Sequence, residues 1–364
     1  MKYTAKIIHA DNRKELSEFL SLPAKIYKKK ELMQDKSEET ALLRGRHILS
    51  RYFKVFPVIA KDENGQTAGR CAVTIYPDRS CAYFGFFECI NDSDAAEKLL
   101  DCAESIAVIE GKDSLVGPVD CSFWIRYRLK TDNFGAPYTG EPYNPDYYAG
   151  LLENCRFSCC GEYISNQFGR IPEEYRDGKF SRRLPQFIQK GYELKSPDRS
   201  TFSCVLSEIY RLIMELYSDF QTFSPITEEE FTALYSPLKH IADFSMVKMA
   251  YFKGEAVGFF VSIPDIGNAA RGSLTPSKLL RILRTKKKCR RYILLYLGIK
   301  PEHKGLGKAL TDELCRTLAV NGADSVGALI RAGKVNGSYF SKLVTEKYTY
   351  RLYSREISRL KAEN

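Results

Sequence analysis

The sequence predicts an α/β fold of two domains, each with a mixed, mostly antiparallel central sheet flanked by helices. The chain has 364 residues, which is more than a single hydrophobic core usually supports. Its composition, 44% apolar and 27% charged residues, is that of a globular protein. The same order of elements, a hairpin, a strand, a helix, a strand, a helix and a strand, occurs in both halves. We therefore expect one domain over residues 1–170, a charged connector over 171–199 and a second domain over 200–364.

The first domain begins with apolar residues at helical spacing, followed by two β-rich runs around Asn64-Gly65, a dipeptide typical of tight hairpins. An aromatic strand follows, which we expect to be covered on both faces, and then a helix that Ser93 or Asp94 is expected to cap. The predicted strands are 55–60, 69–76, 81–90, 114–118 and 161–168, and the predicted helices are 12–22, 92–111 and 144–152.

The second domain contains a capping box, in which Thr227 is followed three residues later by Glu230, and this pattern marks the start of a helix. The insertion 271–291 combines many Lys and Arg side chains with one apolar stripe, so we expect a short basic helix there. The predicted helices are 206–220, 227–236, 306–320 and 336–344, and the predicted strands are 246–252, 256–263, 291–299, 325–331 and 345–356.

The sequence also indicates a cytosolic protein with reduced cysteines. The first ten residues lack the apolar core of a signal peptide and no 18 apolar residues run together, so no membrane association is expected. The eleven cysteines are odd in number, in a long chain without an export signal. Only Cys155, Cys159 and Cys160 lie close together and no histidine is near them, so no metal site is expected.

The charge balance favours an anionic partner. The chain has 55 basic and 45 acidic residues and a formal net charge of +10. A phosphorylated cofactor satisfies this preference, and so does a nucleic acid.

The strand predicted at 291–299 leads into the glycine loop Lys304-Gly305-Leu306-Gly307-Lys308-Ala309 and then into a helix. A phosphate needs main-chain amides with no side chain in the way, and a glycine turn at a helix N-terminus supplies them. The alternative is a tight turn without a ligand. A dinucleotide fingerprint would need a third glycine, and a nucleoside-triphosphate loop would need Ser or Thr at position 309, so neither motif fits.

This loop resembles the signature of the GNAT superfamily of acyl-coenzyme A N-acyltransferases, Gln/Arg-x-x-Gly-x-Gly/Ala at a helix start after a strand. Residues 302–307 match it except at the first position, where Glu302 stands, and the order of elements over 200–358 is similar to that fold. The resemblance implies an acetyl-CoA or another acyl-CoA as donor. It implies pantetheine contacts at Leu297, Gly298 and Ile299, diphosphate contacts at Lys304, Gly305, Leu306, Gly307, Lys308 and Ala309, and a further contact at Asn336.

Residues 70–168 resemble the same fold without its phosphate loop. After the predicted strand 81–90 the chain continues through Asn91-Asp92-Ser93-Asp94, which has no glycine pair and too many carboxylates for a diphosphate. The two halves together are therefore similar to a tandem GNAT-like protein whose first domain does not bind the cofactor.

Acyl transfer to an amine requires a base, a donor for the oxyanion and an acid for the leaving thiolate. The resemblance implies a main-chain amide near Gly298 or Ile299 as the oxyanion donor, and it indicates Tyr339, one position from the family's tyrosine, as the acid. No Asp or Glu lies in 291–300, so Tyr296 or a water chain has to serve as the base. The alternative for both tyrosines is a packing role.

Two further segments carry open alternatives. Aromatic residues crowd 124–148, where they line either an acceptor pocket or an inter-domain seam. In the basic insertion, Lys286, Lys287 and Lys288 contact a cofactor phosphate or RNA, or form a solvated face.

We therefore expect an N-acyltransferase that moves an acetyl or other acyl group from coenzyme A to an amine of a small-molecule or amino-acid-like acceptor. The alternatives are an aminoacyl-tRNA-dependent transferase of tandem GNAT-like fold and a non-catalytic acyl-CoA-binding protein.

Overall fold

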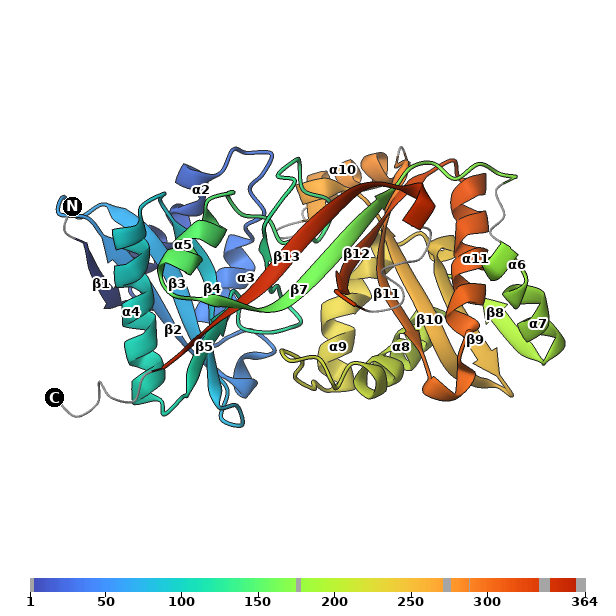
Figure 1. The fold of residues 1–364 in the computed structure, drawn as a ribbon, viewed down its shortest axis with the longest axis horizontal. Helices are drawn as coiled ribbons and strands as arrows, with labels where there is room; N and C mark the ends of the chain where they lie inside the picture. Colours follow the sequence, from blue (N-terminus) through green and yellow to red (C-terminus); the bar gives the residue numbers. More distant parts are fainter. Residues whose placement is uncertain (1–2, 175–177, 271–275, 288, 334–340, 358–364) are drawn as a thin grey trace. The chain divides into compact units, whose positions relative to one another are not determined.

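The computed structural model describes residues 3–174, 178–270, 276–287, 289–333 and 341–357, which fold into two compact units (Figure 1). Unit 1 comprises Met1–Tyr163, Ala270–Leu274 and Tyr348–Asn364, and unit 2 comprises Ile164–Ala269 and Thr275–Lys347. The chain passes from unit 1 to unit 2 within strand β7 (Ser158–Phe168) and returns within strand β13 (Val344–Glu356).

Unit 1 is built on a sheet with the strand order β1-β2-β3-β4-β5-β13. All neighbours in it are antiparallel except β4 and β5, which are parallel. Strand β13 closes this sheet, pairing Tyr353 with Gly117 and Glu356 with Ser114. The strands before β7 are β1 (Thr4–Ile7), β2 (Lys54–Lys61), β3 (Thr67–Ile75), β4 (Cys81–Cys89), β5 (Ser114–Gly117) and β6 (Leu129–Lys130).

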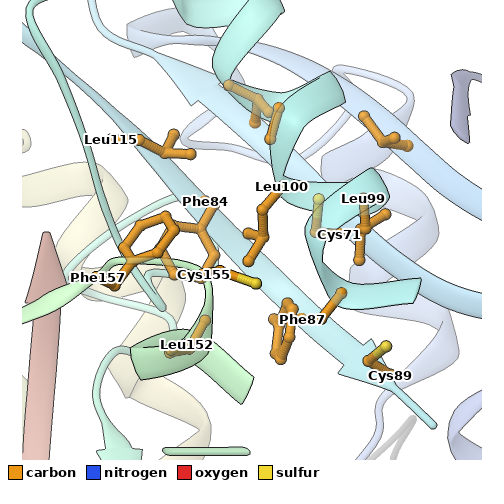
Figure 2. Close-up of a cluster of buried hydrophobic side chains, with 14 of the residues drawn as sticks. Cys71, Phe84, Phe87, Cys89, Leu99, Leu100, Leu115, Leu152, Cys155 and Phe157 are labelled. Carbon is orange, nitrogen blue, oxygen red and sulfur yellow. The ribbon is translucent and has the colours of Figure 1, made fainter. Parts of the chain in front are cut away.

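Helix α4 (Ser93–Ile109) covers one face of this sheet because its apolar residues recur every three or four positions. Figure 2 shows the resulting core, where Leu99 and Leu100 of α4 meet Phe84 and Phe87 of β4. Side chains alternate along β3, so Arg70 points to the other face, over the ring of Phe19. The remaining helices of unit 1 are α1 (Arg13–Ser21), α2 (Pro23–Ile26), α3 (Lys36–Leu43) and α5 (Tyr148–Asn154).

Within unit 2 the strand order is β12-β11-β10-β9-β8. Only β11 and β12 are parallel in this set. Its strands are β8 (Tyr192–Lys195), β9 (Val247–Phe252), β10 (Glu255–Pro264), β11 (Arg291–Ile299) and β12 (Asp324–Arg331).

The main helix of unit 2, α11 (Leu306–Val320), packs against β9, β10 and β11. Its leucines at a four-residue spacing are fully buried, and these are Leu306, Leu310, Leu314 and Leu318. Helix α8 packs against β10 and β11. The other helices are α6 (Gly178–Ser181), α7 (Arg183–Gln189), α8 (Phe202–Leu216), α9 (Glu228–Tyr235) and α10 (Pro276–Lys287).

Three details differ from the expectations drawn from the sequence. Asp92, and not Ser93 or Asp94, caps α4. The segment 171–199, expected to be a connector, contributes α6, α7 and β8 to unit 2, since a few buried aromatics such as Phe187 and Tyr192 are enough to fold it. Residues from Tyr348 onward belong to unit 1 rather than to the second half of the chain. The short helix predicted at 336–344 falls mostly outside the described residues.

All eleven cysteines are free thiols, as expected. Within the part of the chain that the structure describes, no group of three His, Cys, Asp or Glu side chains is placed to hold a metal ion. No helix among the same residues is long and apolar enough to cross a bilayer.

Candidate functional site

Strands β11 and β12 run side by side for a short distance and then separate. They pair from Arg291 with Asp324 to Leu294 with Gly327, although β11 continues to Ile299 and β12 to Arg331. A β-bulge in β11 lies at the point of separation. Val261 of β10 pairs with Tyr296, and the next residue, Ser262, pairs with Leu294, so Leu295 has no partner in β10. A bulge bends a strand and increases its twist. The last five residues of β11 therefore have main-chain groups without a β12 partner in the described residues.

The residues predicted to contact pantetheine lie in this separated stretch. Leu297 and Ile299 pack against the core of α11, and the carbonyl of Leu297 accepts a hydrogen bond from the Tyr217 hydroxyl at 3.4 Å. Gly298 is buried, and a Cβ at its position would lie 2.5 Å from the Phe259 ring. The strand can follow this path only without a side chain at position 298.

The loop after β11 leaves the N-terminus of α11 open. Gly305 occupies the N-cap position with φ of +96° and offers no side-chain cap. Lys308 donates its N–H to the Gly305 carbonyl at 3.2 Å, but the N–H groups of Gly305, Leu306 and Gly307 have no acceptor among the residues that the structure describes. Gly307 is buried, so its N–H is a donor withdrawn from water. This is the donor set of an anion site at a helix N-terminus.

Basic side chains surround this helix end. The guanidinium of Arg183 on α7 lies 3.8 Å from the position of a Cβ on Gly305, and it forms no ion pair with any described residue. Lys304 is exposed, and the Lys308 ammonium lies 5.8 Å from the Phe180 ring. Arg183 was not predicted, because its segment was interpreted as a connector. The only signal for it in the sequence is a pair of arginines shortly before an aromatic residue.

Unit 1 has the same strand geometry but a closed helix end. Strands β4 and β5 pair only from Cys81 with Ser114 to Tyr83 with Val116, and β4 also carries a bulge. However, Asp92 fills the N-terminus of α4. Its carboxylate accepts hydrogen bonds from the N–H groups of Asp94 at 2.9 Å and Ala95 at 3.3 Å.

Asp92 is itself held as an anion. The Tyr3 hydroxyl donates to it at 2.8 Å, and this bond, followed by the main-chain donors, lowers the pKa of the Asp92 carboxyl. A diphosphate at α4 would meet this negative charge, whereas a diphosphate at α11 would meet free N–H groups and arginine.

Tyr296, the predicted base, lies in an aromatic cluster on the α8 and α9 side of β11. Its ring meets that of Tyr217 edge-on at 6.0 Å, and its hydroxyl is hydrogen-bonded to Tyr235. Burial, followed by the charge and hydrogen bond of Tyr296, raises the pKa of Tyr235 well above its ordinary value. Tyr339 and Asn336 lie outside the described residues, so their predicted roles stay predictions.

The structure also describes parts of the basic insertion 271–291 and of the aromatic segment 124–148. In α10, the Lys286 ammonium donates to the Ala242 carbonyl at 2.5 Å, Lys287 is exposed, and Lys288 lies outside the described residues. From the aromatic segment, Tyr127, Tyr143 and Tyr148 line a cavity that lies within unit 1.

Comparison with known proteins identifies the fold. No family model matches the sequence. The sequence is 26% identical over 214 residues to a bacterial ceramide synthase of Caulobacter vibrioides, a match that spans 56% of this chain and about half, 54%, of that relative.

Two solved structures cover nearly the whole chain. A tandem GNAT protein from the clavulanic acid biosynthesis pathway matches with a TM-score of 0.53 and 9% identity, over 98% of this chain and 99% of its own. A GCN5-related glucosamine N-acetyltransferase region of a fungal multi-domain β-N-acetylglucosaminidase matches with a TM-score of 0.53 and 13% identity, over 97% of this chain and 38% of its own. The chain therefore has the tandem GNAT fold, with one GNAT-like unit in each half.

Proposed function

We propose that this protein is an N-acyltransferase that moves an acyl group from coenzyme A to an amine of a small-molecule or amino-acid-like acceptor. The observation that carries the proposal is the open end of α11. Three main-chain N–H groups there lack an acceptor in the described part of the chain, directly after a strand that has separated from its neighbour.

The residues present fit an acyl-CoA. The N–H groups of Gly305, Leu306 and Gly307 would hold the diphosphate, with Arg183 and Lys304 as cationic partners. The main chain of β11 beyond Leu294, which has no β12 partner among the described residues, would face the pantetheine arm. The donor supplies an activated thioester, at whose carbonyl carbon the amine forms a C–N bond as the C–S bond breaks.

Proton transfer is assigned to tyrosine hydroxyls, since β11 contains no carboxylate. The proton lost by the amine would pass to bulk water through the Tyr296 hydroxyl or through a chain of waters. Tyr339 would return a proton to the departing sulfur. The predicted oxyanion donor is an N–H near Gly298 or Ile299.

The test is calorimetric titration of the full chain with acetyl-CoA. Two variants introduce negative charge at the helix end, Gly307→Glu inside the first turn and Lys304→Glu on the exposed loop, and both are expected to weaken binding. We expect Gly307→Glu to abolish binding and Lys304→Glu to weaken it about tenfold, which corresponds to about 1.4 kcal/mol.

The matched control is Lys239→Glu, which makes the same charge change at an exposed residue of unit 2 outside the basic insertion. It should leave CoA binding intact. Circular dichroism of Gly307→Glu checks that this variant still folds. If the wild-type chain does not bind CoA, or binds it equally in all three variants, the proposed site is wrong.

A second candidate differs in chain length. The relative of Caulobacter vibrioides is named a bacterial ceramide synthase, and a ceramide is a long-chain amino alcohol acylated on its nitrogen. That relationship favours a long-chain acyl-CoA and a long-chain amine as the substrate pair. A panel that crosses acetyl-CoA and a long-chain acyl-CoA with small amines, amino acids and a long-chain amino alcohol separates the two, with free thiol release as the readout.

The same experiments address the remaining alternatives. Tight tRNA binding that Lys287→Glu weakens, without CoA affinity, would favour an aminoacyl-tRNA donor. CoA binding without thiol release over the whole panel would favour a non-catalytic acyl-CoA-binding protein.

A further inference from the structure

Unit 1 contains a polar cavity where β4 separates from β5. Its volume is about 30 Å³, and half-buried residues such as Tyr27, Arg126 and Tyr143 form part of its wall. The lining residues all belong to unit 1, and they include Glu88, Asp120, Tyr127 and Arg128. Charged groups and tyrosines dominate this wall, which makes it unlike the apolar core beside it.

Two arginines at or next to this cavity have carboxylate partners. Arg70, which is fully buried and does not line the cavity, contacts Glu39 at 2.8 Å and the lining residue Glu88 at 3.7 Å. Arg126 contacts Asp120 at 2.6 Å. Burial raises the pKa of Glu88, while the neighbouring Arg70 and the Tyr148 hydroxyl act in the opposite direction. Arg70 and Arg126 therefore both have carboxylate partners within unit 1.

Arg128 is different, because it has no carboxylate partner among the described residues. The residue is only 8% exposed, its Nε lacks any hydrogen-bond partner, and it lines the cavity. Its guanidinium is held between the rings of Tyr127 and Tyr163, with centroids at 3.7 and 4.0 Å, and it donates to the Tyr127 hydroxyl. Its backbone has φ of +88°, a conformation that a residue with a side chain adopts at a cost.

A buried cation without an anion is expensive. Contact with two tyrosine rings recovers part of the lost hydration, but the rings supply no full negative charge. A carboxylate is the natural partner of a guanidinium, since its two oxygens match the planar fork of N–H groups. We propose that the cavity of unit 1 binds the carboxylate group of a small ligand, with Arg128 as its counter-ion.

The charge at the cavity supports a carboxylate over a phosphate. A water needs about 10–15 Å³ of such volume, so a cavity of about 30 Å³ admits a small polar group. A phosphate carries about two negative charges at neutral pH, for which one guanidinium without a carboxylate partner does not compensate.

This site is separate from the helix end in unit 2, and the inference does not rest on coenzyme A binding there. The experiment follows the thermal unfolding midpoint of the full chain as sodium acetate is added, with sodium chloride at equal ionic strength as reference. The midpoint should rise in a saturable way with acetate, by about 2–4 °C near saturation. Glycine should act like acetate, whereas methylammonium and inorganic phosphate should not.

Two variants locate the effect. Arg128→Met keeps an unbranched chain between the two tyrosine rings and removes the fork, and it should lose the acetate effect. Arg128→Lys keeps the charge without the fork and should weaken acetate binding about tenfold. The matched control is Arg44→Met in the same unit, whose guanidinium bonds the Ala10 carbonyl at 3.0 Å, and it should keep the full effect.

The wild-type chain alone can overturn the proposal, and if Arg128→Met does not fold, Arg128→Lys locates the effect. An acetate response equal to that of chloride would overturn the proposal, because water alone would then fill the cavity. So would a larger response to phosphate than to acetate, or an undiminished acetate response in folded Arg128→Met. If the chain does not bind CoA but still responds to acetate, the proposed function is wrong and the carboxylate site in unit 1 is supported.

Discussion

The guanidinium of Arg183 lies 3.8 Å from the point where a Cβ on Gly305 would stand, at the N-terminus of α11. Helix α7 packs against α11 and so carries this arginine to the helix end. A helix N-terminus has a partial positive charge of its own, and an arginine beside it adds to that charge instead of neutralising it. Such an arrangement is stable with an anion in place.

Replacing Arg183 by Met should therefore weaken binding of CoA. A charge-assisted contact to a phosphate is worth about 1.5–3 kcal/mol, and an exposed side chain such as this one retains the lower part of that range. We expect the Kd to rise about tenfold by calorimetric titration, with a smaller rise at high salt because screening weakens the contact. Arg182→Met, one residue earlier and also exposed, is the control and should change the Kd by less than about twofold. Equal effects in the two variants would mean that Arg183 has no specific contact.

A second prediction concerns Gly305 itself. Its φ of +96° lies in the region that favours glycine, so Gly305→Ala should destabilise unit 2 by about 1–2 kcal/mol. Gly150 in α5 is the contrasting case, because it is helical and has nothing within 4 Å of its Cβ position. Gly150→Ala should stabilise unit 1 by about 0.5–1 kcal/mol. Urea unfolding curves measure both, and a shift in the same direction for both would contradict the conformational argument.

The elements of the fold were predictable where a short-range signal exists. The Thr227 capping box, the Asn64-Gly65 hairpin and the leucine spacing of α11 all depend on residues within a few positions of each other, and the structure contains each of them. The glycine loop was recognisable for the same reason, since strand, glycines and helix follow one another directly.

What the sequence could not reveal depends on contacts between distant positions. Arg183 reaches Gly305 across more than a hundred residues through the packing of α7 on α11. The cavity at Arg128 depends on strand separation and on β7 placing Tyr163 against the guanidinium. The pairing of β13 with β5 of unit 1 also has no local signal in the sequence. The residue pattern of a strand does not specify which other strand it pairs with.

A third prediction tests the close approach at Gly298. A Cβ there would meet the Phe259 ring at 2.5 Å, and Phe259 is fully buried, so the ring has no room to yield. Gly298→Ala should cost about 1–3 kcal/mol by overpacking. Phe259→Leu shortens the opposing side chain, so the double variant should be more stable than the sum of the two single effects predicts. If the losses of unfolding free energy in the two single variants add up to the loss in the double variant, the side chains at positions 298 and 259 are not in steric conflict.

The last prediction concerns Asp92, whose carboxylate occupies the helix end in unit 1. Because the Tyr3 hydroxyl and two main-chain N–H groups bind the anion, its pKa in the folded chain lies below the ordinary value of 3.8. The stability that it contributes is therefore fully present above pH 3.8 and is lost as the pH falls through the lowered value. At pH 7, Asp92→Ala should cost about 1 kcal/mol, typical of a lost N-cap. Urea unfolding at a series of pH values should show this cost shrinking below pH 3.8.

Asp92→Asn provides the matched control, because it keeps a capping oxygen without the charge. It should lose less than Asp92→Ala at pH 7, and its loss should come from the weaker bonds of a neutral acceptor to Tyr3 and the amides. A cost of Asp92→Ala that stays constant between pH 7 and pH 3 would show that the carboxylate is not held as an anion. In that case the charge of Asp92 would not exclude a phosphate from the N-terminus of α4. The difference in phosphate binding expected between α4 and α11 would then depend on the glycines of the loop before α11 alone.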